Sequence, residues 1–473
     1  MKATALLRHP LPWILLFAAV LRASGAGYLR GSDDLSYARA AADLLEGRYA
    51  PERHFHELRL GVIAPTALSF AAFGVTPGAS LAWPWAASLL SIAALYVLVR
   101  ARADAKVAAL AALLLSVCTQ HVLSGGELFP DAPLTFWILC AACAFDRGLR
   151  GSAPARDFAI AAACFYAATA TRIEALRLIP AFIAWEVFEG PSVTRRRRIA
   201  AFAGVYLGLM AADTGLFAAV TGRPLVRLNE LTAVKSWEAS SAAADMGLSP
   251  MMKSLVSPFG AFGLLVPVAA AGAVLCLRAR RAGPAVGFAA WMLGSTLVLA
   301  GLYRLADGRL YTPLTPWIAW LAAEALGRLP GKRAVAAAAG LALAGSILAH
   351  ARMPSPNLRL FAELDRRLEA DPRPAWSDAR TAGLFAVYYP HRGMRVADGR
   401  PPSPAWLVDN VAVRQIDRAL YGRETFPVPE AAPAFTLEGG QPGIPGLREA
   451  GALALRIKGS GSGPARLRVY RLD

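Results

Sequence analysis

Residues 11–37 have the sequence LPWILLFAAVLRASGAGYLRGSDDLSY, in which an apolar run leads into two adjacent aspartates, Asp33 and Asp34. A helix needs about 20 mostly apolar residues to cross the hydrocarbon core of a bilayer, and this run is close to that length. Carboxylates beside a hydrocarbon boundary are costly, so an acidic pair at this place is typical of a functional site. The alternative is a solvated cap for a helix that begins near Leu35, a position that Asp favours.

The composition of the whole chain is that of a membrane protein. Its 473 residues are 56% hydrophobic with a mean hydropathy of +0.41, and 18% are charged. A net charge of +17 would suit nucleic acid, but the basic residues stand in short clusters between apolar runs, which is how orientation in a bilayer is encoded. We therefore expect no nucleic-acid partner. The clusters, which we place on the cytoplasmic side, are Lys2/Arg8, Arg100/Arg102/Lys106, Arg147/Arg150/Arg156, Arg195 to Arg198, Arg278/Arg280/Arg281 and Arg328/Lys332/Arg333.

Between these clusters, the apolar runs predict about eleven transmembrane helices, each near the length that spans hydrocarbon. The N-terminus is then inside and the segment after residue 350 is outside. Two alternatives stay open: 157–189 could be one re-entrant unit, and the first run could be a cleaved signal peptide. The predicted spans are 11–27, 81–99, 107–123, 130–145, 157–171, 173–189, 199–220, 257–277, 285–303, 313–329 and 334–350.

Two segments differ from this pattern. The apolar run 60–73 is too short to span, so we expect an interfacial helix on the outer face that ends at Gly74. Residues 351–473 are polar and rich in Pro, Gly and Arg, and a helix near Asn357–Ala370 followed by short segments predicts a small α/β domain outside the membrane. We predict a polytopic α-helical membrane protein with a membrane domain, 1–350, and an outer domain, 351–473, which serves as support or in acceptor recognition.

Charged and polar residues gather at the predicted outer ends of the spans. Because Glu127 and Asp131 are four residues apart, their carboxylates would share one helix face. All these residues lie on one side of the membrane, where a shared cavity could collect them. Each group also has a structural alternative to a functional role. The histidines could be ordinary surface residues, the arginines could anchor the chain at the membrane interface, and the 127/131 pair could cap a helix. The set comprises Asp33, Asp34, Tyr37, His54, His56, Glu57 and Arg59 in the first outer loop (28–80), then Glu127, Asp131, Arg172, Glu174, Arg177, Arg304, Asp307, Arg309 and Tyr311.

The order of these residues resembles the GT-C glycosyltransferases. The shared features are the acidic pair after the first span, the segment HFHELRLG at 54–61 before the short apolar helix, and Glu-x-x-x-Asp at 127–131. The chain looks most like bacterial members of the protein O-mannosyltransferase and lipid A aminoarabinose transferase group (glycosyltransferase family 39-like). The segment RLYTP at 309–313 resembles that group's R-Y-x-x-P stretch, with Leu310 inserted. The resemblance covers roughly residues 10–330 and does not include the C-terminal segment.

The resemblance implies an enzyme of the bacterial plasma (inner) membrane that transfers a hexosyl or pentosyl group from a polyprenyl phosphate to an acceptor hydroxyl on the outer face. Inverting transfer needs a base for the hydroxyl proton, and cations to stabilise charge on the departing phosphate. The acidic pair fits the base, with Asp33 preferred and Asp34 capping the following helix. Asp131 resembles the family's second acid, which orients the acceptor or binds a cation.

The remaining residues are assigned by the same resemblance. The residues expected to bind the donor are Arg59, Arg309, Tyr311 and Arg172. Those expected to bind the acceptor or a cation are Glu127, His54, His56 and Glu57. A divalent metal could be held by the histidines, Glu57 and one of the acids, but no spacing here is diagnostic. The competing class is a transporter or flippase for a lipid-linked sugar, which predicts charges along the middles of the spans, where few are found. A membrane scaffold with a sensory domain leaves the acidic pairs unexplained.

Overall fold

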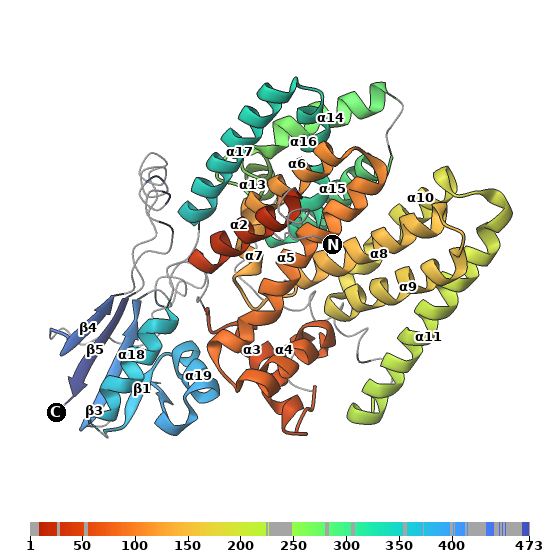
Figure 1. Cartoon of the computed structure of the whole chain (residues 1–473). Helices are drawn as coiled ribbons and strands as arrows, with labels where there is room; N and C mark the ends of the chain where they lie inside the picture. Colours follow the sequence, from red (N-terminus) through yellow and green to blue (C-terminus); the bar gives the residue numbers. More distant parts are fainter. Residues whose placement is uncertain are drawn as a thin grey trace.

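The structure is a computed structural model, mostly helical, with a small sheet near the C-terminus (Figure 1). It describes residues 9–25, 29–51, 55–223, 226, 248–279, 283–303, 308–352, 357–371, 373–397, 401, 403–411, 414, 432–438, 444, 447, 450 and 466–472. The helices, with η for 3₁₀ turns, are α2 (Pro10–Gly25), α3 (Asp33–Leu45), η1 (Phe55–Leu58), α4 (Leu60–Phe73), α5 (Pro77–Arg102), α6 (Ala105–Val117), α7 (Thr119–Gly125), α8 (Asp131–Arg150), α9 (Pro154–Thr171), η2 (Ile173–Leu178), α10 (Ile179–Glu189), η3 (Ser192–Thr194), α11 (Arg195–Thr221), α13 (Leu248–Val256), α14 (Leu265–Arg278), α15 (Pro284–Tyr303), η5 (Gly308–Leu314), α16 (Thr315–Gly327), α17 (Gly331–Arg352), α18 (Leu358–Glu369), α19 (Ala379–Tyr388) and η6 (Pro390–Arg392).

Among the described residues, four helical segments are long and apolar enough to cross a membrane: α5, α8, η3 with α11, and α17. The pair α6 and α7, which is bent by 63°, meets the same length and composition test only when its two helices are taken together as one span. Shorter apolar helices are α2, α4, α14 and residues 284–298 of α15. Every predicted span overlaps a helix of the structure, while the number of crossings stays a prediction.

Several predicted spans are α-helical over only part of their length, and 173–189 is one of them, because it starts in the 3₁₀ turn η2 and α10 begins only at Ile179. Residues 257–264 form turns, because Pro258 and the left-handed Gly263 (φ +59°) interrupt the helix before α14 begins at Leu265. The segment 313–329 starts in the 3₁₀ turn η5, and α16 begins only at Thr315. The short helix is confirmed as α4, and it ends at Gly74 with φ +76° as expected.

The bend between α6 and α7 has no proline or glycine to mark it. It lies at Cys118, where the buried guanidinium of Arg22 donates from Nη1 to the carbonyl of Ser116 at 3.2 Å and from Nε to Ser88 Oγ at 2.7 Å. An arginine thus satisfies a carbonyl that the interrupted helix leaves without its usual partner. The bend directs α7 toward the loop that carries Glu127 and Asp131.

Helix α4 lies against the end of α9 at one very close approach. A Cβ on Gly61 would lie 2.2 Å from Thr171 Oγ1 and 2.6 Å from the Thr171 backbone nitrogen. Only glycine therefore allows this contact. The contact brings η1 and Arg59, which precede α4, close to Arg172, the residue that follows α9.

The described residues of the C-terminal part form a five-stranded sheet in the order β2-β1-β3-β5-β4. Strand β1 (Ala375–Ser377) pairs parallel with β2 (Arg395–Val396) and β3 (Ala405–Asn410), while β5 (Arg466–Leu472) is antiparallel to β3 and β4 (Phe435–Glu438). The predicted helix near 357–370 is α18, the segment 406–411 is largely β3, and 383–389 lies mostly within α19.

The C-terminal part is packed on the first loop of the membrane part. Buried side chains of one sheet face, α18 and α19 form one continuous core with those of α3 and α4. Figure 1 shows α19 beside α3 at the lower end of the helical bundle. The first outer loop therefore lies between the helical bundle and the C-terminal sheet.

Candidate active site

Asp33 and Asp34 begin α3 and have very different surroundings. Asp34 is 2% exposed, and its carboxylate accepts backbone N–H bonds from Arg30 (2.7 Å), Ser32 (2.7 Å) and Gly31 (3.3 Å). Burial raises the pKa of Asp34, and these hydrogen bonds oppose the rise. The prediction that Asp34 caps α3 needs correction: the loop folds back over the helix start, so the carboxylate binds N–H groups that precede the helix.

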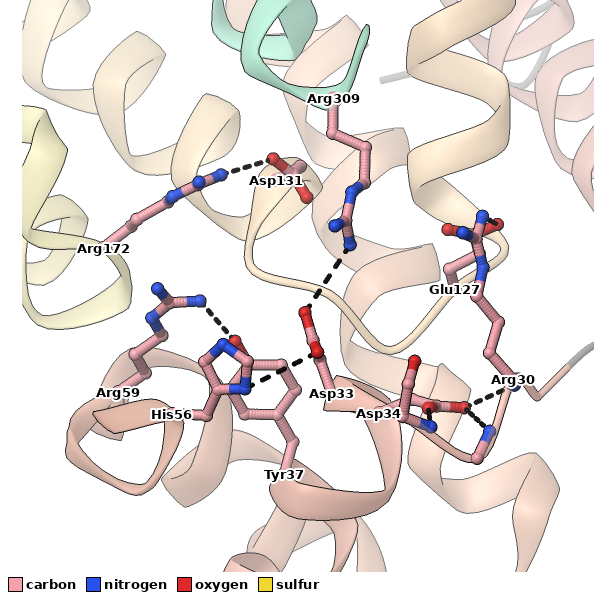
Figure 2. A network of polar contacts seen from close by, with 12 residues as sticks. Arg30, Asp33, Asp34, Tyr37, His56, Arg59, Glu127, Asp131, Arg172 and Arg309 are labelled. Atoms are coloured by element: carbon pink, nitrogen blue, oxygen red, sulfur yellow. Dashed lines mark hydrogen bonds and ion pairs between the residues drawn. The ribbon is translucent and has the colours of Figure 1, made fainter. Parts of the chain in front are cut away.

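The carboxylate of Asp33, unlike that of Asp34, is accessible to solvent. Its side chain is 34% exposed and points between His56 and Arg309 (Figure 2). The distances are 3.8 Å from Oδ1 to His56 Nδ1 and 3.9 Å from Oδ2 to Arg309 Nη1. These distances exceed hydrogen-bond length, so the carboxylate has an imidazole and a guanidinium nearby and keeps lone pairs accessible to a third group.

Arg309 and Arg30 meet at one aromatic ring. The guanidinium carbon of Arg309 lies 4.3 Å from the centre of the Phe129 ring, and that of Arg30 lies 5.4 Å from it. Arg30 also pairs with Glu127 at 2.5 Å. Cation–π contacts of this kind hold guanidinium groups in place.

A second acidic centre lies at the start of α8. Asp131, 1% exposed, accepts from Arg172 Nη1 at 3.0 Å, and Arg172 Nε donates to Glu174 at 3.0 Å. Burial alone would raise the pKa of Glu174, but Arg172 and Arg59 outweigh it and lower that pKa to about 2. Burial likewise opposes the charge of Arg172, yet Glu174 and Asp131 raise its pKa above the ordinary value.

His56 lies on η1 and Arg59 directly follows it, and both side chains contact Tyr37 of α3. Arg59 is 4% exposed and donates from Nη1 to the Tyr37 hydroxyl. The rings of Tyr37 and His56 lie 5.3 Å apart. Burial raises the pKa of Tyr37, although the charge of Arg59 opposes the rise, so this hydroxyl stays protonated and accepts from the arginine.

Other predicted site residues lie apart from this network. Tyr311 is fully buried, and its hydroxyl donates to the carbonyl of Met251 at 3.1 Å. Glu57 accepts a hydrogen bond from the Tyr49 hydroxyl at its backbone carbonyl. His54 lies outside the described residues. In the part of the chain that the structure describes, no group of three or more His, Cys, Asp or Glu side chains could hold a metal ion.

Three contributing residues were not assigned a role from the sequence. Arg30 and Phe129 lie within the segments that carry the acids, and only their position beside Asp33 and Glu127 could have drawn attention to them. Arg177 donates to the carbonyl of Leu310 at 3.4 Å and to Thr296 Oγ1 at 3.0 Å, which steadies the turn that carries Arg309. Burial lowers the pKa of Arg177 to about 10.

The apolar helical bundle collects acids and arginines at one end, beside the acidic pair of the first loop, and this arrangement resembles the GT-C glycosyltransferases. The comparisons with known proteins confirm that resemblance. The family model described as dolichyl-phosphate-mannose-protein mannosyltransferase matches residues 64–215. No curated protein sequence matches the chain.

Solved structures share the fold at low sequence identity. ArnT from Cupriavidus metallidurans in the apo state is 16% identical with a TM-score of 0.60, over 86% of this chain and 94% of that one. The same protein bound to undecaprenyl phosphate is 15% identical with a TM-score of 0.58, over the same shares of the two chains. The Archaeoglobus fulgidus oligosaccharyltransferase tethered to an acceptor peptide is 16% identical with a TM-score of 0.52, over 82% of this chain and 64% of that one.

Proposed function

We propose that this chain is an integral-membrane glycosyltransferase that moves a sugar from a polyprenyl phosphate to an acceptor hydroxyl. The observation that carries the proposal is Asp33, an accessible carboxylate between His56 and Arg309 at the end of an apolar bundle. The binding of undecaprenyl phosphate by the ArnT of similar fold supports a lipid-linked donor.

In the proposed reaction, the acceptor oxygen forms a bond to the anomeric carbon while the bond from that carbon to the phosphate oxygen breaks. The electron pair of the broken bond goes to the phosphate, and the hydroxyl proton goes to Asp33. Arg309, which is 28% exposed, stabilises the charge that develops on the phosphate. Asp131, almost fully buried against Arg172, holds that arginine in place rather than taking a proton.

The orientation we propose has the site and residues 351–473 on the outer face of the bacterial plasma membrane, with about eleven crossings. Contacts among the basic clusters support it, because several clusters meet at the opposite end of the bundle. Arg102 pairs with Asp146 and Glu189, and Lys106 donates to the carbonyls of Gly327 and Leu329 at 3.0 Å.

The test is to incubate membranes that contain the protein with a labelled polyprenyl-phosphate sugar. We expect label to leave the lipid and appear on an acceptor, and to stay on the lipid with the Asp33→Asn variant. Movement of the intact labelled lipid across the bilayer, without release of the sugar, would instead identify a transporter or flippase.

A further inference from the structure

The C-terminal part touches the site loop directly at residue 29. The side chain of Asn357, at the start of α18, accepts from the Leu29 backbone N–H at 3.0 Å and donates to the Leu29 carbonyl at 2.7 Å. Asn357 is 7% exposed. Both backbone groups of one loop residue are therefore held by one side chain that lies 328 positions further along the chain.

A second contact lies two residues on, at Gly31. This glycine has φ +68°, and a Cβ there would lie 2.8 Å from Arg380 Cβ and 3.0 Å from the Arg380 carbonyl oxygen. Arg380 cannot easily move away, because Asp378 accepts from the backbone N–H of Arg380 at 3.0 Å and of Thr381 at 2.8 Å and so anchors the first turn of α19.

The same loop carries the bonds that hold the acidic pair. Asp34 accepts from the N–H groups of residues 30, 31 and 32, so the loop and the start of α3 form one unit. Leu35, in the first turn of α3, packs so closely on α19 that a Cβ at Gly383 would lie 2.6 Å from Leu35 Cδ2. Asp33 therefore belongs to a unit that packs on the C-terminal part, while its own carboxylate faces Arg309 and His56.

We propose that the C-terminal domain positions Asp33. Gly31 and Asn357 are the positioning residues, because the contacts between this domain and the loop before Asp33 are made at Gly31 and by Asn357. This inference rests on the proposed function, since it concerns the geometry of the proposed base. Neither residue touches the carboxylate of Asp33, so each acts through the loop. Displacing a reacting group by about 1 Å can cost about 10²-fold in rate.

The experiment compares Gly31→Ala with Gly47→Ala in the full chain. Gly47 has a similar left-handed conformation, φ +72°, but apart from its two chain neighbours no heavy atom of the described residues lies within 4 Å of a Cβ built there. Both alanines carry the same backbone strain, and only the one at residue 31 presses on Arg380. We expect kcat for sugar transfer to fall about 10²-fold in Gly31→Ala with donor KM little changed, and Gly47→Ala to retain near wild-type kcat.

Adding Arg380→Gly to Gly31→Ala removes the nearest contact atom and should restore part of the lost kcat, whereas Arg380→Gly alone should have a small effect. Equal kcat in Gly31→Ala and Gly47→Ala overturns the inference, even if the wild type is active. If Gly31→Ala does not accumulate, Asn357→Ala decides by the same measurement, and an unchanged kcat there overturns the inference. A wild-type protein without transfer would instead refute the proposed function.

Discussion

At the scale of single residues, the most informative contrast is between two neighbours of identical chemistry. The carboxylate of Asp34 accepts hydrogen bonds from three backbone N–H groups, while that of Asp33 lies 3.8 Å from the His56 imidazole and 3.9 Å from the Arg309 guanidinium. Helix geometry explains the difference, since successive residues point about 100° apart around the axis. One aspartate therefore faces the loop and the other faces the site.

Substitution of each aspartate by asparagine separates the two roles. Asp33→Asn keeps the shape and removes the proton acceptor, so the rate of transfer should fall by about 10²–10⁴-fold. Asp34→Asn places an amide against backbone donors, so it should lower stability by about 1–3 kcal/mol and reduce the rate less. Transfer rates and thermal unfolding, with protein levels checked, decide the matter. Near-normal turnover in both variants would remove the main support for an enzyme.

Arg309 should bind the donor phosphate. Arg309→Ala removes a charge-assisted contact of about 1.5–3 kcal/mol, and should weaken donor use without affecting insertion in the membrane. Arg309→Lys should recover only part, because lysine cannot offer a bidentate fork. Arg48→Ala is the control, since Arg48 is an exposed arginine of the same loop that carries Asp33. Unchanged donor KM and kcat in Arg309→Ala would mean that Arg309 serves only as a structural contact on the Phe129 ring.

Glu174 should contribute to acid sensitivity. Its pKa is lowered from 4.5 to about 2 in the folded protein, so its stabilising effect is complete above pH 4.5 and is lost as the pH falls toward 2. Glu174→Gln should therefore show a smaller loss of thermal stability across that interval than the wild type. Glu46→Gln, at an exposed acid, serves as control. Identical pH profiles for wild type and Glu174→Gln would contradict the pairing with Arg172.

At the scale of elements, the site depends on how closely helices approach one another. The run 60–73 is recognisable as a helix because its apolar residues end at a glycine, and α4 has those bounds. The bend at Cys118 could not be predicted, because hydropathy is continuous across it and its support, Arg22, comes from another helix. The turns at 257–264 were missed because apolar composition outweighed the local breakers Pro258 and Gly263.

The contact between α4 and α9 gives a prediction at this scale. Gly61→Ala places a Cβ 2.2 Å from Thr171 Oγ1, which should push α4 and η1 away from α9 and cost about 1–3 kcal/mol of stability. Since η1 and Arg59 precede α4, transfer should fall as well. Gly78→Ala is the matched control, because outside its own helix no heavy atom of the described part lies within 4 Å of its Cβ. Equal thermal unfolding of both variants would contradict the tight contact.

At the scale of the whole molecule, one core joins the first loop to the C-terminal sheet, so the site is built between parts distant in sequence. The outer side of this loop rests on α19 (Figure 1). A molecule of this design needs the C-terminal part on the same side of the membrane as the site. Orientation in the membrane is therefore the property to measure.

Labelling of engineered cysteines tests that orientation. Cysteines at Ser152, Ser192 and Gly331 should be shielded from a membrane-impermeant reagent added outside, because the basic clusters near them favour the cytoplasmic face. Cysteines at exposed positions of residues 351–473, such as Arg359 on α18, should react. Each variant is labelled again after the membrane is opened, which shows that its cysteine is reactive. Labelling of Ser192→Cys from outside would overturn the layout and the outward site with it.

The sequence by itself determined the membrane class, the positions of most helices and the acidic pair with its nearby arginines. These follow from local properties, namely apolar length, charge clusters and glycine or proline at helix ends. Only the tertiary structure decided that Asp33 is open and Asp34 closed, that Arg309 lies on Phe129, and that the Tyr311 hydroxyl bonds to Met251 instead of entering the network. The physical reason is that the partner of a polar side chain depends on which distant segments pack beside it, and that information is not carried by any one stretch of the chain.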